Sequence, residues 1–510
     1  MKKHPYRYWI IARRIVQYLS LLLFLVVFLL VPSRDKADPL LNVFFRFDPL
    51  VALARTIASR EIIQPLIAGL VVLGLSLFVG RAWCGWICPL GTLLDIFQLR
   101  KKEKKPGPNY RKLPEKLRSI KYIVIMILLF SAVLGNLTLL VLDPLTILMR
   151  SLTTAILPAV DQITRVAEAN LYRLPLLSDW VTSFDRIIRP ALLPSQPIYP
   201  REALPGIALL AGIILLNLAS PRFWCRYLCP LGGLLGLLSK FSLLRREVSP
   251  DCKNCQLCSS ACPTGTIDPS KGFESDPAEC TLCLDCLESC PRTSISFKAK
   301  WASVKWNPEY DPSRRQAIGS LLTATAAIAL FRSDWRRFQP PAFLLLPPGA
   351  QENTLLSQCV RCGMCIRACP TGALSPASQE FGIESLWTPI VTPRLGYCEY
   401  SCKNCSDVCP THAIPLMTIE EKRQQVIGKA YIDQNRCLAW SDHIDCIVCE
   451  EMCPLPQKAI FLEETPITDE NGSTRLIQLP HVQRDRCIGC GVCEYKCPLV
   501  GEAAIRVRTT

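Results

Sequence analysis

Residues 81–91 read RAWCGWICPLG, and residues 222–232 repeat this pattern as RFWCRYLCPLG. Each stretch follows an apolar run and holds two cysteines with three residues between them, and proline comes directly after the second. Arginine, tryptophan, leucine and glycine recur around the cysteines with the same spacing. The tetrapeptides FDPL (47–50) and LDPL (142–145) extend the repeat, because FDPL follows the first apolar run and LDPL follows the third. The sequence therefore predicts a duplicated helical hairpin.

Cysteine is far more frequent than in an average chain. The 510 residues include 28 cysteines, which divide without remainder into six groups of four and the two pairs quoted above. Short-range quartets are typical of metal and cluster sites rather than of disulfides. The formal net charge is +15, but Lys and Arg gather beside apolar runs instead of along one soluble face. We therefore expect a membrane-oriented protein and no nucleic-acid partner.

Four apolar runs have about the length that spans a bilayer, for which about 20 residues are needed. Basic residues are dense before the first run, after the second and after the fourth, so these three segments are predicted to be cytoplasmic. The first run is too long for a cleaved signal and is predicted to be an anchor. Both cysteine pairs then lie at cytoplasmic helix ends of an integral inner-membrane protein. The runs are Ile15–Val31, Ile62–Val79, Tyr122–Leu142 and Leu204–Leu218.

The two pairs, Cys84 with Cys88 and Cys225 with Cys229, admit several interpretations. Four thiolates brought together by the repeat could bind a metal or a cluster, or could cycle between thiol and disulfide. Small apolar filling at a helix end is the alternative without chemistry. The sequence leaves a redox site and a metal site open.

Asp48 and Asp143 each precede a proline in the repeated tetrapeptides. Both are candidates for accepting protons near a quinol. An aspartate N-cap followed by proline at the first helical position is the favoured interpretation, because that combination commonly begins a helix.

Residues 252–263 read CKNCQLCSSACP, and residues 280–291 read CTLCLDCLESCP. Both match the bacterial run C-x2-C-x2-C-x3-C-P, in which three close thiolates hold one [4Fe-4S] cluster and the fourth reaches the neighbouring cluster. A zinc ribbon would not explain the triple spacing or the prolines. The predicted ligands are Cys252, Cys255, Cys258 and Cys290 for one cluster, and Cys280, Cys283, Cys286 and Cys262 for the other.

A moderately apolar segment after Arg314 and Arg315 resembles an internal twin-arginine signal. A short helix on the membrane surface is the alternative. Export is favoured because domains carrying iron-sulfur clusters would have to cross the membrane already folded. The part that follows is therefore predicted to lie on the exoplasmic or periplasmic side.

Four further quartets follow a proline-rich stretch at 339–350 and supply enough thiolates for four [4Fe-4S] clusters. The first and fourth keep the regular spacing, whereas the second and third have a longer first gap. This favours nested pairing, first with fourth and second with third, although sequential pairing would supply the ligands equally well. The predicted ligands are Cys359, Cys362, Cys365 and Cys369; Cys398, Cys402, Cys405 and Cys409; Cys437, Cys446, Cys449 and Cys453; and Cys487, Cys490, Cys493 and Cys497.

The predicted fold class is multi-domain. It combines an α-helical membrane bundle, made of four helices as a duplicated hairpin with a fifth candidate helix, and bacterial two-cluster ferredoxin-like α+β modules. The predicted domains are 1–246 (membrane, with two C-x-x-x-C-P motifs), 247–300 (two-cluster ferredoxin), 301–350 (linker with the twin-arginine-like segment) and 351–510 (four-cluster ferredoxin).

These motifs resemble two known families. Residues 1–300 are similar to NapH-type membrane ferredoxins of periplasmic nitrate reductase systems, which have four helices, two C-x-x-x-C-P motifs and two [4Fe-4S] motifs. Residues 313–510 are similar to NapG/MauM-type ferredoxins, through the twin-arginine leader, the PPGA stretch and four cluster motifs. In those families the two proteins are separate and relay electrons from quinol to a periplasmic reductase, so the resemblance implies a fusion of the two.

No nucleophile triad or phosphate-binding loop indicates chemistry on a substrate. The sequence therefore predicts a membrane-bound polyferredoxin with six [4Fe-4S] clusters, and with a quinone as a further candidate cofactor. It would relay electrons between the quinone pool or a cytoplasmic donor and a partner oxidoreductase, as an electron carrier or as the quinol dehydrogenase component of a larger enzyme. The alternative is an accessory or maturation factor of the kind that NosR and CcoG represent.

Overall fold

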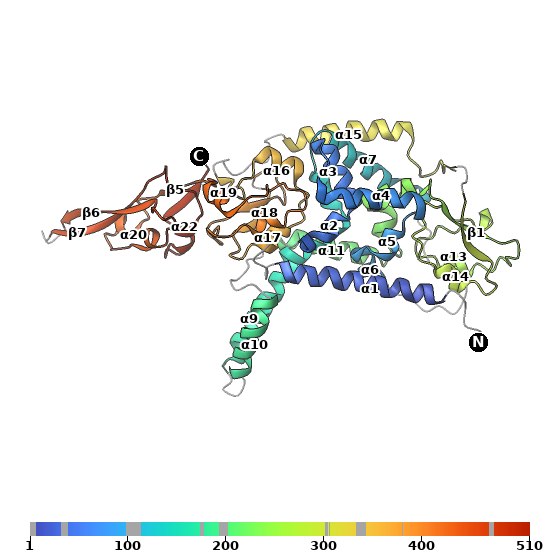
Figure 1. Ribbon diagram of the computed structural model, residues 1–510, viewed down its shortest axis with the longest axis horizontal. Coiled ribbons are helices and arrows are strands. Elements are labelled where there is room, and N and C mark those ends of the chain that lie inside the picture. Colours follow the sequence, from blue (N-terminus) through green and yellow to red (C-terminus); the bar gives the residue numbers. More distant parts are fainter. Residues whose placement is uncertain are drawn as a thin grey trace. The chain divides into compact units, whose positions relative to one another are not determined.

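The computed structural model forms two compact units, each described here by itself (Figure 1). The first unit contains residues 1–29, 42–151 and 204–330, and the second contains 30–41, 152–203 and 331–510. The structure describes residues 7–31, 39–97, 114–173, 178–192, 202–300, 304, 306–332, 343–379, 381–468 and 474–509.

The first unit begins with a helical part whose core is built from α3, α7 and α12. α12 packs on α7 and α4, and α3 packs on α4 and α7. The side chains of Leu50, Ile125 and Leu235 are fully buried between them. The helices are α1 (Arg7–Leu30), α2 (Val43–Arg46), α3 (Pro49–Ser59), η3 (Gln64–Leu66), α4 (Ile67–Val79), α5 (Ala82–Trp86), α6 (Pro89–Ile96), η4 (Glu115–Arg118), α7 (Ser119–Val133), η5 (Thr138–Leu142), α8 (Pro144–Ser151), α11 (Ala203–Leu216), the π-helical η7 (Trp224–Leu228) and α12 (Pro230–Ser239).

The predicted bundle of four spanning helices is not supported. α1 has 24 residues, whereas α4, α7 and α11 have 13, 15 and 14. A straight helix needs about 20 residues to cross the hydrocarbon core. In the part of the chain that the structure describes, α1 alone is long and apolar enough for a span, and an N-terminal signal or a core helix would meet the same criterion. Pro65 lies in the short turn before α4, inside the second run, and Gly135 follows the end of α7, inside the third; α11 covers most of the fourth run, which is itself short.

The first unit continues with a small α+β module that contains the first two cysteine quartets. β1 and β2 pair antiparallel, with Leu244 opposite Ala299 and Val248 opposite Ile295. The predicted boundary between residues 246 and 247 lies within β1. The elements are β1 (Leu244–Val248), α13 (Leu257–Ala261), η8 (Pro269–Lys271), α14 (Asp285–Ser289) and β2 (Ile295–Ala299).

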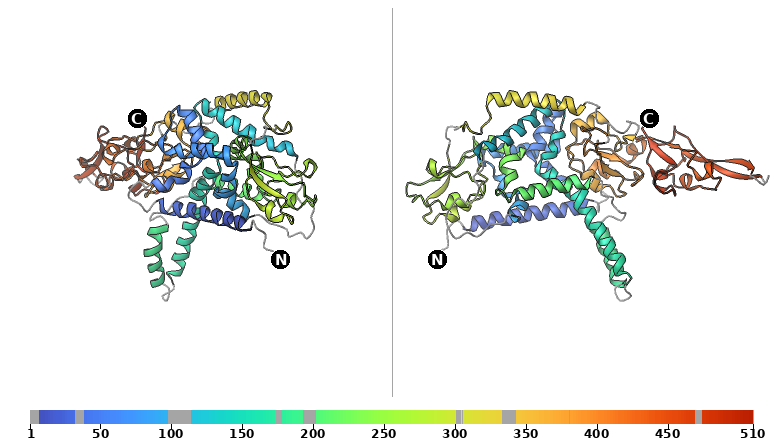
Figure 2. Two further views of the ribbon diagram at one scale, coloured as in Figure 1. Left: turned by 45° about the vertical axis from the view of Figure 1, so that its right-hand side comes forward. Right: turned by 180° about the vertical axis from the view of Figure 1, so that it is seen from behind.

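α15 (Arg314–Arg332) contains the segment predicted to be a twin-arginine signal. It is one continuous helix of 19 residues, and its described buried side chains Ser320, Ala324 and Ile328 form a single narrow stripe. The helix lies along the helical part of the first unit (Figures 1 and 2). Export of the following residues stays a prediction.

The second unit contains α9 (Leu157–Leu171) and α10 (Ser178–Leu192), which run antiparallel as a helical hairpin (Figure 2). Its larger part carries the four C-terminal quartets on short helices and two-stranded antiparallel sheets, β3–β4, β5–β8 and β6–β7. The elements are η2 (Pro39–Asn42), η6 (Leu152–Ile156), α16 (Glu352–Gln358), α17 (Met364–Ala368), β3 (Leu374–Pro376), β4 (Pro389–Val391), α18 (Asn404–Asp407), α19 (Ile419–Gln424), β5 (Lys429–Ile432), α20 (Leu438–Ser441), α21 (Val448–Glu451), β6 (Ile460–Thr468), β7 (Thr474–Val482), α22 (Val492–Lys496) and β8 (Ile505–Arg508).

Candidate functional site

The four quartets with regular spacing share one backbone conformation. In each, the residues directly before and after the second cysteine have positive φ, and a short helix begins within two residues of that cysteine. Glycine occupies only some of these positions, so the turn is imposed by the cysteine spacing and not by glycine alone. The residues are Asn254, Gln256, Leu282, Leu284, Arg361, Gly363, Gly489 and Gly491. The chain therefore wraps around one point at each quartet.

In the first two-cluster module the last cysteine of one quartet joins the other quartet. The thiol of Cys262 neighbours those of Cys280, Cys283 and Cys286 and raises the pKa of each, after the larger effect of burial. Cys290 is partly buried and packs against the core of the same module, which contains cysteines of both quartets. The structure thus brings Cys262 to the three cysteines with which the spacing groups it, whereas the role of these residues as ligands stays a prediction.

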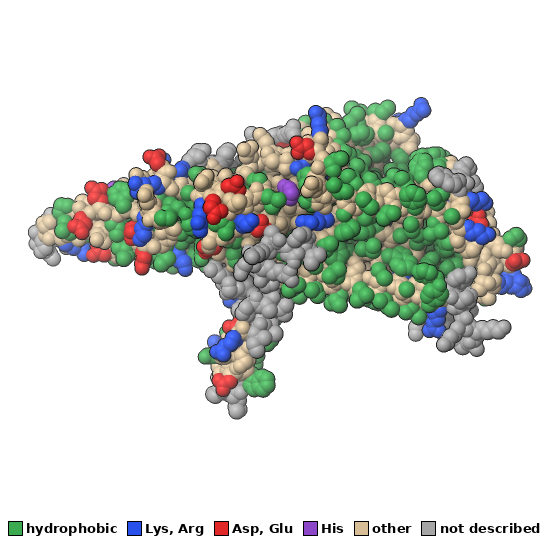
Figure 3. All heavy atoms as spheres, in the orientation of Figure 1, with side chains coloured by type: hydrophobic (Ala, Val, Ile, Leu, Met, Phe, Trp, Pro, Cys, Tyr) green, Lys and Arg blue, Asp and Glu red, His purple; other side chains and the backbone are tan. Residues whose placement is uncertain are grey.

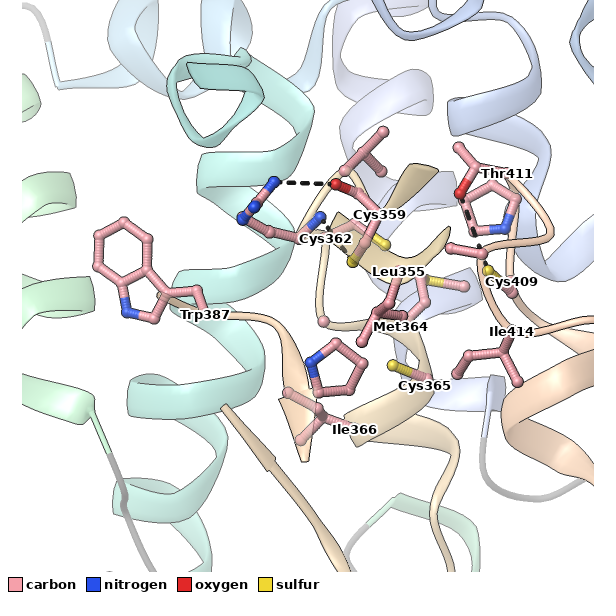
Figure 4. Close-up of a pocket in the computed structure, with 16 residues that line it drawn as sticks. Leu355, Cys359, Cys362, Met364, Cys365, Ile366, Trp387, Cys409, Thr411 and Ile414 are labelled. Carbon is pink, nitrogen blue, oxygen red and sulfur yellow. Dashed lines mark hydrogen bonds between the residues drawn. The ribbon is translucent and has the colours of Figure 1, made fainter. Parts of the chain in front are cut away.

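In the second unit, three cavities are each lined by four cysteines from two quartets. Figure 4 shows the first cavity, which α17 and the loop after α18 enclose together with Met364 and Ile414. The lining cysteines are Cys359, Cys362, Cys365 and Cys409 in the first cavity; Cys398, Cys402, Cys405 and Cys369 in the second; and Cys437, Cys446, Cys449 and Cys497 in the third. At the remaining quartet, the thiol of Cys453 neighbours that of Cys490.

The nested pairing favoured from the spacing is therefore wrong, and the pairing is sequential. The first and second quartets exchange Cys369 and Cys409, and the third and fourth exchange Cys453 and Cys497. A hairpin explains each exchange: β3–β4 lies between the first two quartets, and β6–β7 lies between the last two. Pairing neighbours in the chain also closes shorter loops, which costs less conformational entropy.

The two pairs of quartets meet through the second and the fourth. The backbone N–H of Cys398 donates a hydrogen bond of 2.8 Å to the carbonyl oxygen of Cys490. Beside this contact, the ring centroids of Tyr397 and Tyr495 are 5.5 Å apart. The four cysteine sites of the second unit thus follow one another in the spatial order first, second, fourth, third.

Burial disfavours the charged form of these thiols. It raises the pKa of Cys359 and Cys398 to about 11, and that of Cys449 and Cys490 to about 12. Such thiols are neutral near pH 7 and become ligands when a metal cation replaces the proton. The arrangement suits sites that are filled with metal.

The donor set fits clusters better than single ions. Among the residues that the structure describes, no three His, Cys, Asp or Glu side chains converge closely enough to hold one metal ion. Thiolates on the corners of a cubic cluster lie farther apart than the ligands of a tetrahedral ion. Four thiols around one cavity supply the number of ligands that a [4Fe-4S] cluster takes.

In the first unit, the two C-x-x-x-C-P motifs have nearly the same conformation. The second cysteine of each is the N-cap of the next helix, with φ −60° and ψ 114° at Cys88, and φ −64° and ψ 116° at Cys229. Proline follows at the first helical position of α6 and α12, where its fixed φ suits the helix. The thiol of Cys229 accepts a hydrogen bond of 3.3 Å from the N–H of Gly232. The predicted repeat is present, and each motif leads into a helix.

The arginine that begins each motif binds the opposite motif. Arg81 Nη2 donates to the carbonyl oxygen of Cys225 (3.3 Å), and Arg222 Nη1 donates to that of Cys84 (3.2 Å). Both arginines are 1% exposed. Arg222 also pairs with Asp95 at 2.6 Å. This reciprocal exchange joins the two copies into one unit with approximate two-fold symmetry, which we call the C-x-x-x-C-P repeat.

The first two-cluster module lies directly on the C-x-x-x-C-P repeat. A Cβ on Gly85 would lie 2.0 Å from the carbonyl oxygen of Thr281, in the loop of the second quartet. The equivalent residue of the other copy is Arg226, and a Cβ on Gly265, just after Cys262, would lie 2.8 Å from its Nη2. Each copy of the repeat therefore contacts one of the two cluster loops. The backbone of Thr281 leaves no room for a side chain at position 85, whereas the guanidinium of Arg226 lies beside Gly265.

A buried ion-pair network that sequence reasoning missed holds the module in place. Glu279 lies 2.5 Å from Lys121 Nζ and 3.3 Å from Arg81 Nη1, and it accepts a hydrogen bond of 3.2 Å from the hydroxyl of Tyr122. Burial by itself would raise the pKa of Glu279, but Lys121, Arg118 and Arg81 outweigh it and hold the pKa at about 2. The sign of this network in the sequence is the acidic residue directly before Cys280, but the spacing of the cysteines gives no reason to single it out.

Arg246 is a second residue that sequence reasoning missed. Its guanidinium neighbours the thiols of Cys258, Cys280 and Cys286, and it lowers the pKa of each against the larger effect of burial. A cation at this place favours the more negative, reduced state of a cluster held there. In the sequence, Arg246 is only one of several basic residues after the fourth apolar run, and nothing marks it as a neighbour of these cysteines.

Asp48 and Asp143 are helix caps, as favoured from the sequence. Asp48 Oδ1 accepts from the N–H groups of Leu50 and Val51, and Asp143 Oδ2 accepts from those of Leu145 and Thr146, at 2.8 to 3.2 Å. Both side chains are fully buried. They begin α3 and α8 at equivalent places in the two copies.

Replacing Asp143 with alanine should lower the free energy of unfolding by about 1 kcal/mol or more, because the cap is lost in a buried place. Asparagine should retain most of the stability, since its amide oxygen can accept the same two hydrogen bonds. Thermal unfolding of both purified variants measures this difference. Equal stability of the two variants would contradict the cap, whereas a stable asparagine variant that fails to oxidise quinol would indicate the proton-acceptor role.

Comparison with known protein families agrees with these groupings. A model described as a 4Fe-4S binding domain matches residues 64–106 and 202–249, which hold the two C-x-x-x-C-P motifs. A model described as a 4Fe-4S dicluster domain matches residues 358–413, which hold the first two C-terminal quartets. The first result supports the duplication, and the second supports sequential pairing.

Several curated relatives are described as ferredoxin-type proteins. The methylamine utilization ferredoxin-type protein MauM of Methylobacillus flagellatus is 38% identical over 35% of this chain and 73% of its own length. MauM of Methylorubrum extorquens is 37% identical over 38% of this chain and 89% of its own length. The ferredoxin-type protein NapG of Escherichia coli is 38% identical over 29% and 62%. No solved structure matches the chain.

Proposed function

Since the chain belongs to the family of MauM ferredoxin-type proteins, we propose that it is a membrane-bound electron carrier with six [4Fe-4S] clusters. It would relay electrons between the quinone pool or a cytoplasmic donor and a partner oxidoreductase. The observation that carries the proposal is the grouping of cysteines in fours around common points, with one ligand exchanged within each pair of quartets. Clusters held in this arrangement would lie side by side, as a carrier requires.

The contact between Cys398 and Cys490 supports a continuous path in the second unit. Electrons would pass the four C-terminal clusters in the order first, second, fourth, third, so the first and third quartets hold the end clusters. The first two-cluster module would exchange electrons with the helical part beneath it.

Membrane attachment is supported by the surface of the first unit. Large apolar side chains are exposed along α1, α4 and α11, and Figure 3 shows hydrophobic side chains covering the face on which these helices lie. A contiguous apolar surface of this kind marks contact with a membrane or a partner. We propose that this part is embedded as a helical bundle anchored by α1, with the first two-cluster module cytoplasmic and the second unit exoplasmic. A topology reporter fused after Thr510 tests that placement, and a cytoplasmic signal would contradict it.

Iron and sulfide analysis of anaerobically purified full-length protein tests the cluster content. We expect about 24 iron atoms per chain from the six ferredoxin-type sites, with EPR signals of reduced [4Fe-4S] clusters. Replacing Cys362 with alanine should remove about four of them. Eight iron atoms or fewer per chain would contradict the proposal.

Turnover separates the carrier from the accessory factor. A carrier should oxidise a quinol analogue, or reduce a quinone analogue, at a steady rate through many cycles. An accessory factor would hold the clusters and show no sustained turnover. Sustained turnover lost in the Cys362 variant would support the carrier.

A further inference from the structure

The third C-terminal quartet is the more open of the two ends of the spatial order first, second, fourth, third. Cys446, Cys449 and Cys497, which line its cavity, are only partly buried, whereas three of the four cysteines around the cavity of the first quartet are buried. α17, which carries part of the first quartet, packs against η6 of the same unit. The first end is therefore partly covered by the chain itself, and the third quartet is the end that another molecule can reach.

The long first gap of the third quartet forms a fixed loop. Its eight residues lie against β7, where Trp440 Nε1 donates a hydrogen bond of 3.2 Å to the carbonyl oxygen of Pro480. Farther along the loop, the carbonyl oxygen of His443 accepts a hydrogen bond of 2.5 Å from Arg475 Nη2, which also belongs to β7. A surface that is already ordered loses little conformational freedom when a partner binds to it.

Large apolar side chains are exposed around this quartet. One lies in the fixed loop, and two lie within the quartet, directly before or after a cysteine. The fourth follows Pro498 and Leu499, which line the same cavity as the cysteines of the third quartet. A gathering of exposed apolar side chains marks contact with a partner. The exposed fractions are 52% for Ile444, 44% for Ile447, 38% for Met452 and 96% for Val500.

The charges of this quartet oppose those of the chain as a whole. Residues 437–453 contain four acidic residues and neither Lys nor Arg, although the chain has a formal net charge of +15. Glu450 pairs with Lys458 at 2.8 Å, and Asp442, Asp445 and Glu451 are exposed. Acidic side chains steer a positively charged partner toward this place and repel the anionic lipids of a membrane surface. A basic protein therefore fits this face better than a bilayer does.

We propose that this surface, which we call the third-quartet face, is the docking site for a redox protein that presents Lys and Arg around an apolar centre. The inference deepens the proposed function and rests on it, because it assigns the partner oxidoreductase to one end of the electron path. In each transfer, one electron passes between the third cluster and the partner, so that one is oxidised and the other is reduced. No bond is formed or broken, and no proton is required. The face consists of Asp442, Ile444, Asp445, Ile447, Glu450, Glu451, Met452 and Val500.

The rate of electron transfer to a basic protein gives the first test. The probe is a small c-type cytochrome with lysines around its exposed haem edge, mixed with reduced full-length holoprotein in stopped flow. Combining Asp442→Asn, Asp445→Asn and Glu451→Gln should slow its reduction about ten-fold at low salt. The difference should vanish at 1 M salt, where charges are screened within about 3 Å. Equal rates for the variant and the wild type at low salt would overturn the inference.

Substitutions of apolar residues give the second test. Val500→Ser should slow reduction of the cytochrome about five-fold at both low and high salt, because salt does not screen an apolar contact. Leu416→Ser and Glu420→Gln are the matched controls, since both residues are exposed and follow the second quartet in the chain. Both should keep the wild-type rate. Equal slowing in the controls, or an unchanged rate in Val500→Ser, would overturn the inference.

Cross-linking of the wild-type protein tests the same face without any substitution. A carbodiimide joins lysine amines of the cytochrome to carboxylates in direct contact with them, and the cross-linked peptides are identified by mass spectrometry. We expect them to contain residues 437–453. Cross-links confined to other parts of the chain would overturn the inference.

Ferricyanide separates failure of the inference from failure of the proposed function. It is a small one-electron acceptor that needs no docking surface, so wild type and variants should all reduce it. A protein that reduces ferricyanide but shows neither the charge dependence nor the cross-links would overturn the inference alone. A protein with far fewer than 24 iron atoms per chain, or one that fails to reduce ferricyanide, would contradict the proposed function itself.

Discussion

Replacing Glu279 with glutamine is expected to lower the free energy of unfolding of the first unit by about 3–5 kcal/mol. Glu279 is fully buried, and Lys121 and Arg81 pair with it at 2.5 and 3.3 Å. Removing one partner of a buried ion pair leaves an uncompensated charge in a place that water cannot reach. Thermal unfolding of the purified holoprotein, followed by the loss of cluster absorbance, measures the effect. Because the network links the two-cluster module to the helices, the clusters of that module should be lost first.

Glu247 provides the matched control for Glu279. It pairs with Lys298 and Lys300 at the surface, at 3.4 and 3.1 Å, and exposed pairs contribute little to stability. Glu247→Gln should therefore unfold at the wild-type temperature. Combining Glu279→Met with Lys121→Met should recover part of the loss, since a buried pair can often be exchanged for apolar side chains. A Glu279→Gln variant as stable as wild type would contradict the role of the network.

The sequence predicts local features well because short spacings determine them. The caps at Asp48 and Asp143 and the turns around the close cysteines of each regularly spaced quartet depend on a few consecutive residues, and the structure has both. The duplication was also visible, since the two copies keep the same residues at the same spacing. Sites built from one short segment are therefore predictable.

The pairing of the C-terminal quartets and the lengths of the helices in the apolar runs could not be predicted from short spacings. Regular spacing suggested that the first and fourth C-terminal quartets belong together. The hairpins β3–β4 and β6–β7 instead bring each quartet beside the adjacent quartet in the chain. Apolar composition suggested three further spans, but it does not reveal where a helix begins and ends inside an apolar run. Glu279 and Lys121 are separated by 158 positions in the chain, so only the fold shows that they pair.

Replacing Gly85 with alanine is expected to separate the first two-cluster module from the C-x-x-x-C-P repeat. The new Cβ would lie 2.0 Å from the carbonyl oxygen of Thr281, and that atom belongs to backbone that cannot rotate away. Overpacking of this kind typically costs about 1–3 kcal/mol, and the loop between Cys280 and Cys283 must move to relieve it. Hydrogen exchange of residues 280–286 should rise in the variant, and electron exchange between the helical part and the module should slow. Gly74→Ala in α4 is the matched control, because nothing lies within 4 Å of its Cβ, and it should gain up to about 1 kcal/mol from helix propensity. Unchanged exchange protection in Gly85→Ala would show that the module does not rest on this glycine, and the path from the repeat to the clusters would then have to run elsewhere.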